Sequence, residues 1–234
     1  MLSYRHQFHA GGVADVFKHV VLTRLLVALA QKDKPFFVLD THAGIGLYDL
    51  EHPWSGKTEE WRHGVGRIWA RADSPPAMAP YLDALRRENP DGRLRFYPGS
   101  PRIAQGLMRA QDRLAMCELN KDDYAALQRA FAGARNTVIQ NTDGFAAVRA
   151  FLPPKERRGL TFIDAAFDQA QEFDRIVRTV EAALARFGTG MIAIWHPLLD
   201  APAMQAFERS LLSIKPPKTL QLELSFRPET WTEY

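Results

Sequence analysis

Short apolar runs recur along the chain, and each of the first four ends at or leads into an acidic residue. The runs are 36–40, 114–118, 137–140 and 160–164, and the acids are Asp40, Glu118, Asp143 and Asp164. A short continuous apolar run is typical of a strand buried on both faces of a parallel sheet. The pattern predicts four such strands, and two further runs at 190–195 and 219–226 predict a fifth and a sixth.

Apolar positions at helical spacing lie between these predicted strands. They predict helices at 14–31, 102–113, 122–132, 145–151 and 173–187. Strands that alternate with helices are typical of a parallel α/β sheet with right-handed crossovers. We therefore expect an α/β fold with a mostly parallel sheet and helices on both faces.

One stretch interrupts the alternation. Between about residues 47 and 95, five prolines separate two predicted helices near 59–72 and 77–88. We interpret this stretch as a small helical insertion. The predicted organisation is an N-terminal segment with the start of the core at 1–46, the insertion at 47–95, and the remainder of the core at 96–234.

Composition narrows the class of protein. A hydrophobic fraction of 46% with 24% charged residues excludes a disordered or low-complexity chain. One cysteine excludes a disulfide framework and a zinc cluster of cysteines, and fits a reducing compartment. The longest apolar run near the start is too short to span a bilayer, and no secretory signal is present. We expect a cytoplasmic protein that is not bound to a membrane.

The predicted strand ends carry the candidate chemistry. In open α/β sheets, ligands bind beyond the carboxyl ends of the strands, so the four acids would lie on one rim. The turn at 40–46 contains Gly44 and Gly46, which would let the backbone approach a ligand. The alternative is that each acid caps a helix or forms an ion pair. A carboxylate such as Glu118 after the second strand can accept hydrogen bonds from both ribose hydroxyls of an adenosine cofactor, with Asp143 and Gly144 beside the adenine. The turn lacks the full GxGxxG pattern, which disfavours a nicotinamide-dependent oxidoreductase.

The N-terminal segment interleaves basic and aromatic side chains from Tyr4 to His9. Such a segment suits contact with an exposed base and its phosphates, although a solvated tail before a helix has the same composition. Its histidines lack a metal-binding spacing, so we expect no metal. A sequence pI of about 9.1 permits a polyanionic partner. Five arginines of the insertion could add salt-dependent RNA affinity: Arg62, Arg67, Arg71, Arg86 and Arg87.

Several long motifs together resemble one known family. They are Met-Leu-Ser-Tyr-Arg-His at the start, His-Ala-Gly, Ala-Asp-Val-Phe-Lys-His, Leu-Asp-Thr-His-Ala-Gly, Tyr-Pro-Gly-Ser-Pro and Asp-Gly-Phe. In this order and spacing they resemble the 23S rRNA adenine-N6 methyltransferase J family. The resemblance covers residues 1 to about 226. It implies a Rossmann-like class I methyltransferase fold, S-adenosyl-L-methionine (SAM) as cofactor, and 23S rRNA, naked or at an early stage of assembly, as partner.

The resemblance also implies roles for individual residues. The SAM site would comprise His19, His42, Ser100, Glu118, Asp143, Gly144 and Asp164. Asp164 would also be catalytic, and Phe167 would stack on the target base. Tyr4 would contact the RNA, and Lys18 would lie near the cofactor or the RNA backbone. We expect a monomer.

The chain departs from the family in two places. Related amino-adenine methyltransferases carry Asp-Pro-Pro-Tyr or Asp-Pro-Pro-Phe after the fourth strand, whereas this chain has Asp164-Ala165-Ala166-Phe167. The family also continues beyond the position of Tyr234, so the C-terminus looks shortened. The missing prolines leave open an alternative, a catalytically impaired nucleic-acid-binding protein of the same fold, including a role in the use of external DNA.

Overall fold

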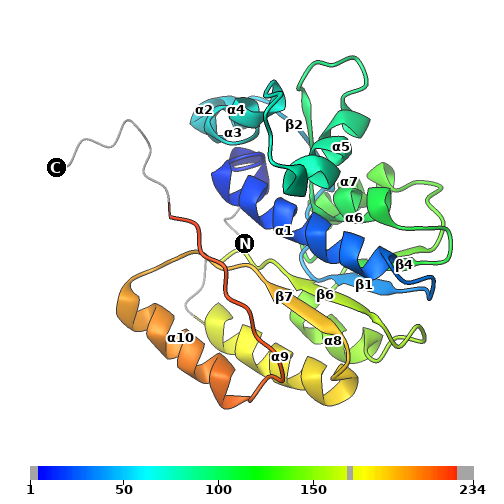
Figure 1. Cartoon of the computed structure of the whole chain (residues 1–234), viewed down its shortest axis with the longest axis vertical. Coiled ribbons are helices and arrows are strands. Elements are labelled where there is room, and N and C mark those ends of the chain that lie inside the picture. The colour runs from blue at the N-terminus through cyan, green and yellow to red at the C-terminus, as the bar shows by residue number, and fades with distance from the viewer. Residues whose placement is uncertain (1–4, 168–170, 226–234) are drawn as a thin grey trace.

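A five-stranded parallel sheet forms the centre of the molecule (Figure 1). The computed structural model describes residues 5–167 and 171–225. The sheet order is β5-β4-β1-β6-β7, and all four strand pairs are parallel. The strands are β1 (Phe37–Asp40), β4 (Arg113–Cys117), β5 (Thr137–Gln140), β6 (Gly159–Ile163) and β7 (Met191–Ile194). The first five predicted strands are therefore confirmed.

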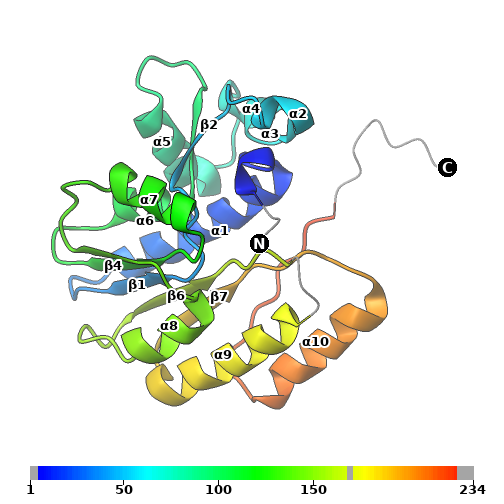
Figure 2. The same ribbon diagram turned by 180° about the vertical axis from the view of Figure 1, so that it is seen from behind.

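Helices cover both faces of this sheet (Figures 1 and 2). One face carries α1 (Val13–Ala30), α6 (Ser100–Leu107) and α7 (Lys121–Ala130), preceded by a short 3₁₀ turn, η1 (His6–Phe8). The other carries α8 (Gly144–Phe151) and α9 (Glu172–Phe187), with α10 (Ala201–Ser213) packed on α9. This is the predicted Rossmann-like α/β architecture.

The central strands are buried on both sides, as their uninterrupted apolar runs require. Val38 of β1 packs with Leu22 and Leu26 of α1 in the larger core cluster. Its neighbours Phe37 and Leu39 point to the opposite face, where they pack with Val148 and other residues of α8 and α9. Alternate residues of one strand thus anchor helices on opposite faces, which holds the carboxyl ends of β1, β4 and β6 together.

The inserted stretch packs beside the N-terminal end of α1 (Figure 1). It contains β2 (Leu47–Asp49), the short helices α2 (Ser55–Thr58), α3 (Glu60–His63) and α4 (Val65–Trp69), the 3₁₀ turn η2 (Pro76–Met78), and α5 (Ala79–Glu88). The predicted helix near 77–88 is present, whereas that near 59–72 is two short helices that break at Gly64. An added Cβ at Gly64 would lie 2.2 Å from the carbonyl oxygen of Gly11, so close backbone contact requires a glycine here. An antiparallel pair of β2 with β3 (Phe96–Pro98), which we did not predict, closes the insertion.

Two predicted features need correction, and one helix was missed. The described part of 219–226, residues 219–225, forms no strand, and Leu220, Leu222 and Leu224 are 81%, 52% and 44% exposed. Their alternation is strand-like, but none of the described strands forms a backbone ladder with them. The helix predicted at 102–113 ends at Leu107, where Met108 turns extended (ψ 147°). The helix α10 was not predicted.

Candidate functional site

An open cavity lies beyond the carboxyl ends of the strands, with about 1160 Å³ of empty space when the solvent at its mouth is included. Every described residue that the sequence analysis assigned to cofactor binding lines it: His19, His42, Ser100, Glu118, Asp143, Gly144 and Asp164. Lys18 lines it as well. These residues come from six separate segments of the chain, and the parallel sheet brings them together.

Glu118 lies immediately after β4 and faces the turn that follows β1. Its Oε2 accepts a hydrogen bond from the Gly44 N–H (2.9 Å), and its Oε1 accepts one from the Asn120 N–H (2.8 Å). Burial raises the pKa of this carboxyl. Gly44 has φ 61°, and an added Cβ would lie 2.3 Å from the Tyr48 hydroxyl, so the turn requires a glycine there. A carboxylate oxygen accepts about two hydrogen bonds, so Glu118 retains acceptor capacity toward a ligand.

Asp143 begins α8 and joins it to α9. Its Oδ1 accepts a hydrogen bond from the Phe145 N–H (2.9 Å), and its Oδ2 forms an ion pair with Arg175. The Arg175 guanidinium also lies 4.3 Å from the centroid of the Phe145 ring. Local partners therefore exist for this acid, as the capping alternative anticipated. Asp143, Phe145 and Arg175 still form one wall of the cavity.

His42 is held as a neutral ring. Burial lowers the pKa of His42 to about 4. The Thr41 hydroxyl donates its single proton to the Phe162 carbonyl (2.9 Å), so it accepts from His42 Nδ1 at 2.8 Å. The proton of the ring is then on Nδ1, and Nε2 is a hydrogen-bond acceptor.

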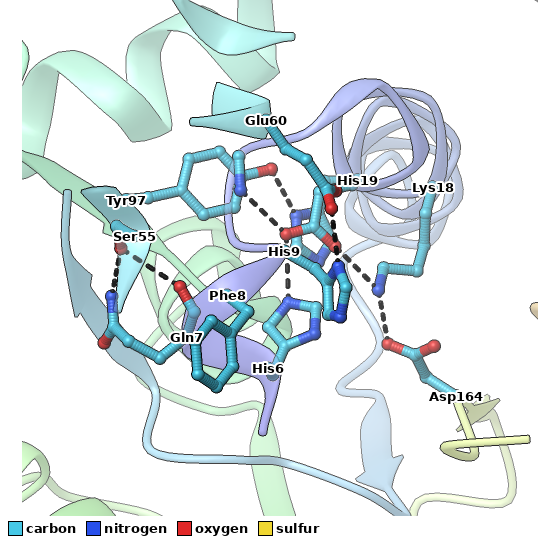
Figure 3. Close-up of polar contacts among 12 residues, drawn as sticks. His6, Gln7, Phe8, His9, Lys18, His19, Ser55, Glu60, Tyr97 and Asp164 are labelled. Atoms are coloured by element: carbon cyan, nitrogen blue, oxygen red, sulfur yellow. Dashed lines mark hydrogen bonds and ion pairs between the residues drawn. The ribbon is translucent and has the colours of Figure 1, made fainter. Parts of the chain in front are cut away.

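His19 lies at the end of a buried chain of hydroxyl groups. Tyr81 donates to the Tyr97 hydroxyl (3.2 Å). The Tyr97 proton is then donated to His19 Nδ1 at 2.8 Å (Figure 3). Burial lowers the pKa of His19 to about 3, so this ring is neutral too. Its proton is then on Nε2, which makes His19 a hydrogen-bond donor. His19 and His42 thus present opposite polarity at Nε2.

The opposite wall contains a buried row of alternating charges. Asp164, directly after β6, accepts a hydrogen bond through Oδ2 from Lys18 Nζ at 2.6 Å, and the same ammonium lies 2.9 Å from Asp15 Oδ1 (Figure 3). Asp15 Oδ2 in turn is 3.0 Å from both His6 Nε2 and the Gly11 N–H. The row ties Asp164, through α1, to the N-terminal segment.

In this row, neighbouring charges shift the pKa values of Lys18 and Asp15 more strongly than burial does. Burial would lower the pKa of Lys18, but the charges of Asp15 and Asp164 raise it above its ordinary value. Burial would likewise raise the pKa of Asp15, but His6 and Lys18 hold it well below its ordinary range. Lys18 is therefore a permanent cation, and it fixes where the Asp164 carboxylate lies.

Sequence reasoning missed three residues of this region. Asp15 appeared only inside a family motif, and Arg175 not at all, because a single charged residue within a helix gives no local signal of its partner. Trp195, directly after β7, was left without a role. Its ring centroid lies 5.7 Å from Lys18 Nζ, next to the Asp164 ion pair. A run of Trp-His-Pro at a strand end was the available signal for Trp195.

Asp40, the remaining acid of the four at strand ends, is buried and does not line this cavity. Burial raises the pKa of Asp40 to about 7, opposed in part by a hydrogen bond from Ser100. The folded protein therefore binds this proton more tightly than the unfolded chain. The resulting stability is fully present below pH about 4 and is lost as the pH rises to about 7.

We expect Asp40→Asn to remove this pH dependence. For the unmodified protein, the free energy of unfolding should fall between pH 5 and pH 7 by at most about 1.4 kcal/mol per pH unit from this group. Urea unfolding at several pH values measures it, with exposed Asp33→Asn as the control. An Asp40→Asn profile as steep as that of the control would contradict the assignment.

Two of the predicted residues are not placed in the cavity. Tyr4 lies outside the described residues. Phe167 has φ 55°, a strained value for a residue with a side chain. Its ring packs against Phe173 (centroids 5.1 Å apart) and does not line the cavity, although Ala165 and Ala166 do.

The histidines of the N-terminal segment have carboxylate partners. His6 meets Asp15, and His9 Nδ1 lies 2.8 Å from Glu60 of the insertion (Figure 3). Among the described residues, no group of three or more His, Cys, Asp or Glu side chains is arranged to hold a metal ion. Nor does the described part of the chain contain a helix with the length and apolar character needed to cross a membrane.

Comparison with known proteins places the chain in a family. It is 42% identical over 231 residues to Ribosomal RNA large subunit methyltransferase J of Haemophilus influenzae, and 39% identical over 230 residues to the protein of that name from Escherichia coli. Each alignment covers 98% of this chain and 82% of the relative. The crystal structure of protein LPL1258 from Legionella pneumophila superposes with a TM-score of 0.83 at 38% identity, covering 88% of this chain and 76% of that one. The family model described as "RsmJ: Ribosomal RNA large subunit methyltransferase D, RlmJ" matches residues 33–233. These matches confirm the resemblance seen in the sequence, and the chain belongs to this family.

Proposed function

We propose that this protein transfers a methyl group from SAM to the exocyclic N6 amine of an adenine in 23S rRNA. The curated relatives are named as methyltransferases of large-subunit ribosomal RNA. The observation that carries the proposal is the single cavity that gathers all seven residues expected for the cofactor and ends at Asp164. The action on RNA would take place in the cytoplasm, where ribosomal RNA is made.

The donor set of the cavity fits an adenosine-containing cofactor. Glu118 offers carboxylate oxygens to a pair of ribose hydroxyls, and the Phe145 and His42 rings, 4.8 Å apart, form an apolar wall. The neutral His19 donates from Nε2, which suits a carboxylate end of the ligand. SAM supplies an electrophilic methyl group when bound. The residues described here bind and orient the two reactants.

Asp164 is positioned to act on the acceptor amine. The lone pair of an adenine amine is delocalised into the ring, so an acceptor for its hydrogens favours the pyramidal, reactive form. Lys18 occupies Asp164 Oδ2, which leaves Oδ1 to accept one amine hydrogen and later the proton. The carbonyl of Ala165, which lines the same cavity, can accept the second. Lys18 orients the carboxylate for this task, a role that the resemblance, which implied only a place near the cofactor or the RNA backbone, did not specify.

A catalytically impaired RNA-binding protein is the second candidate, and one observation favours it. The Phe167 ring packs on Phe173 and does not line the cavity. The aromatic ring expected to stack on the target base is therefore missing from the cavity wall. The Ala165-Ala166 sequence lacks the fixed φ that prolines would impose on this turn. In this candidate, SAM would still bind while turnover would be low.

Binding of SAM tests the proposal before any RNA is needed. We expect Glu118→Gln to weaken SAM binding by about 10- to 150-fold, because a hydrogen bond to a charged group contributes about 1.5–3 kcal/mol. Isothermal titration calorimetry measures this, with the exposed Glu181→Gln as the matched control. A folded protein that binds no SAM would overturn the proposal, and equal affinity in both variants would overturn the role of Glu118.

A further inference from the structure

A second cavity, of about 500 Å³, adjoins the first beside the insertion. His6 and Asp123 line both cavities. The walls that belong to the second cavity alone include Arg5, Ile45, His52 and Trp54. It is therefore formed by the N-terminal segment on one side and the insertion on the other, and it opens next to the row of charges that ends at Asp164.

The walls of this cavity have the chemistry of a nucleotide site. Trp54 is one of the few large apolar side chains left exposed (37%), and the Arg5 guanidinium lies 5.9 Å from its ring centroid. His52 meets the same indole edge-on with ring centroids 5.3 Å apart. The backbone N–H of Trp54 donates to His52 Nδ1 (3.1 Å), so the proton of the neutral ring is on Nε2, a donor. Aromatic surface, a cation and a ring donor together suit the face, phosphate and edge of a nucleotide.

The two sides of the cavity are held rigidly together. Buried Gln7 donates from Nε2 to Ser55 Oγ (2.7 Å) and to the Asp49 carbonyl (3.0 Å), and Ser55 Oγ donates back to the Gln7 carbonyl at 3.0 Å (Figure 3). Phe8 stacks on Trp54, with centroids 5.3 Å apart and planes 12° apart. These contacts, of which the Gln7–Ser55 hydrogen bond is buried, already attach the segment to the insertion. The exposed part of Trp54 and the space beside it are not needed for that attachment.

We propose that this second cavity binds the nucleotide adjacent to the target adenine of an RNA substrate. The inference rests on the proposed function and extends it with a flanking subsite. The shared wall at His6 connects the two positions, since His6 pairs with Asp15, Asp15 with Lys18, and Lys18 with Asp164. A base stacks against Trp54, and its phosphate competes with Asp123 for Arg5, whose ion pair with that carboxylate measures 3.1 Å.

The test compares ligands that differ only in the flanking nucleotides. With S-adenosylhomocysteine present, adenosine monophosphate and a trinucleotide with adenosine between two uridines are titrated by calorimetry. We expect the trinucleotide to bind the unmodified protein about tenfold more tightly. Trp54→Ala should reduce this ratio to below about twofold, and Trp54→Phe should retain it because a stacking ring remains.

Controls separate this subsite from general attraction and from the proposed function. Arg93→Ala removes an exposed cation of the same insertion, which pairs with Glu51, and should leave the ratio unchanged. His52→Ala, at an exposed position, should lower the ratio even if Trp54→Ala does not fold. Equal ratios in the unmodified protein, Trp54→Ala and His52→Ala would overturn the subsite while leaving the proposed function in place. A failure of adenosine monophosphate to bind at all would overturn the proposed function instead.

Discussion

Replacing Asp164 with asparagine should slow methyl transfer to an adenine-containing RNA by about 10²- to 10⁴-fold, the usual contribution of a positioned acid or base. Asparagine keeps the shape of the side chain but cannot take up the proton of the amine. It also turns a charge-assisted contact with Lys18, now 2.6 Å long, into a contact with a neutral amide. Single-turnover transfer of a radiolabelled methyl group measures the rate.

The control for this change is Asp174→Asn, at an exposed position in the first turn of α9. It removes the same charge from an exposed position outside the cavity and should leave the rate within about twofold of the unmodified protein. If Asp164→Asn transfers methyl groups as fast as Asp174→Asn, Asp164 is not the acceptor for the amine proton. Titration with SAM separates lost chemistry from lost cofactor binding in either variant.

Introducing the two missing prolines, Ala165→Pro with Ala166→Pro, should raise the rate of methyl transfer by about a hundredfold. A proline at 165 restricts the backbone of Asp164, and one at 166 restricts Ala165, whose carbonyl is the second proposed acceptor. A misplacement of about 1 Å at reacting groups costs about a hundredfold. Neither alanine N–H donates to another described residue, so the prolines remove no hydrogen bond seen in this structure.

The same assay measures the double variant against each single variant. Cofactor affinity should stay within about twofold, because neither alanine is among the seven residues assigned to the cofactor. An unchanged turnover number would show that the alanine turn already holds Asp164 correctly. The proposal of an impaired RNA-binding protein would then lose its main chemical argument. The proposal of an active methyltransferase would hold for the unmodified chain.

The strands and the strand-end acids could be predicted because both are local. An apolar run such as 36–40 identifies a buried strand without knowledge of its neighbours, and parallel pairing then puts the residues after each run at one edge. The contact of Lys18 with Asp164 could not be predicted, because it joins residues 146 positions apart through the packing of α1 against the sheet. The direction of the Phe167 ring depends on a backbone angle and on Phe173, neither of which leaves a periodic signal.

The error at 219–226 has the same physical origin. Alternating leucines satisfy the pattern of a strand, but a strand forms only where another strand offers its backbone groups. The β2–β3 pair is the converse case, because three-residue strands are too short to show a period. Pairing between strands distant in sequence therefore limited both predictions.

The open flank of β7 sets a practical limit on handling the protein. In the described part of the chain β7 pairs on one side only, with β6, and the leucines at 220, 222 and 224 stay in contact with water. Unpaired strand edges and exposed apolar side chains are both templates for aggregation between molecules. Light scattering should therefore accompany every titration, because association between protein molecules would produce a signal that resembles weak ligand binding. Affinities measured on dilute samples will be the least affected.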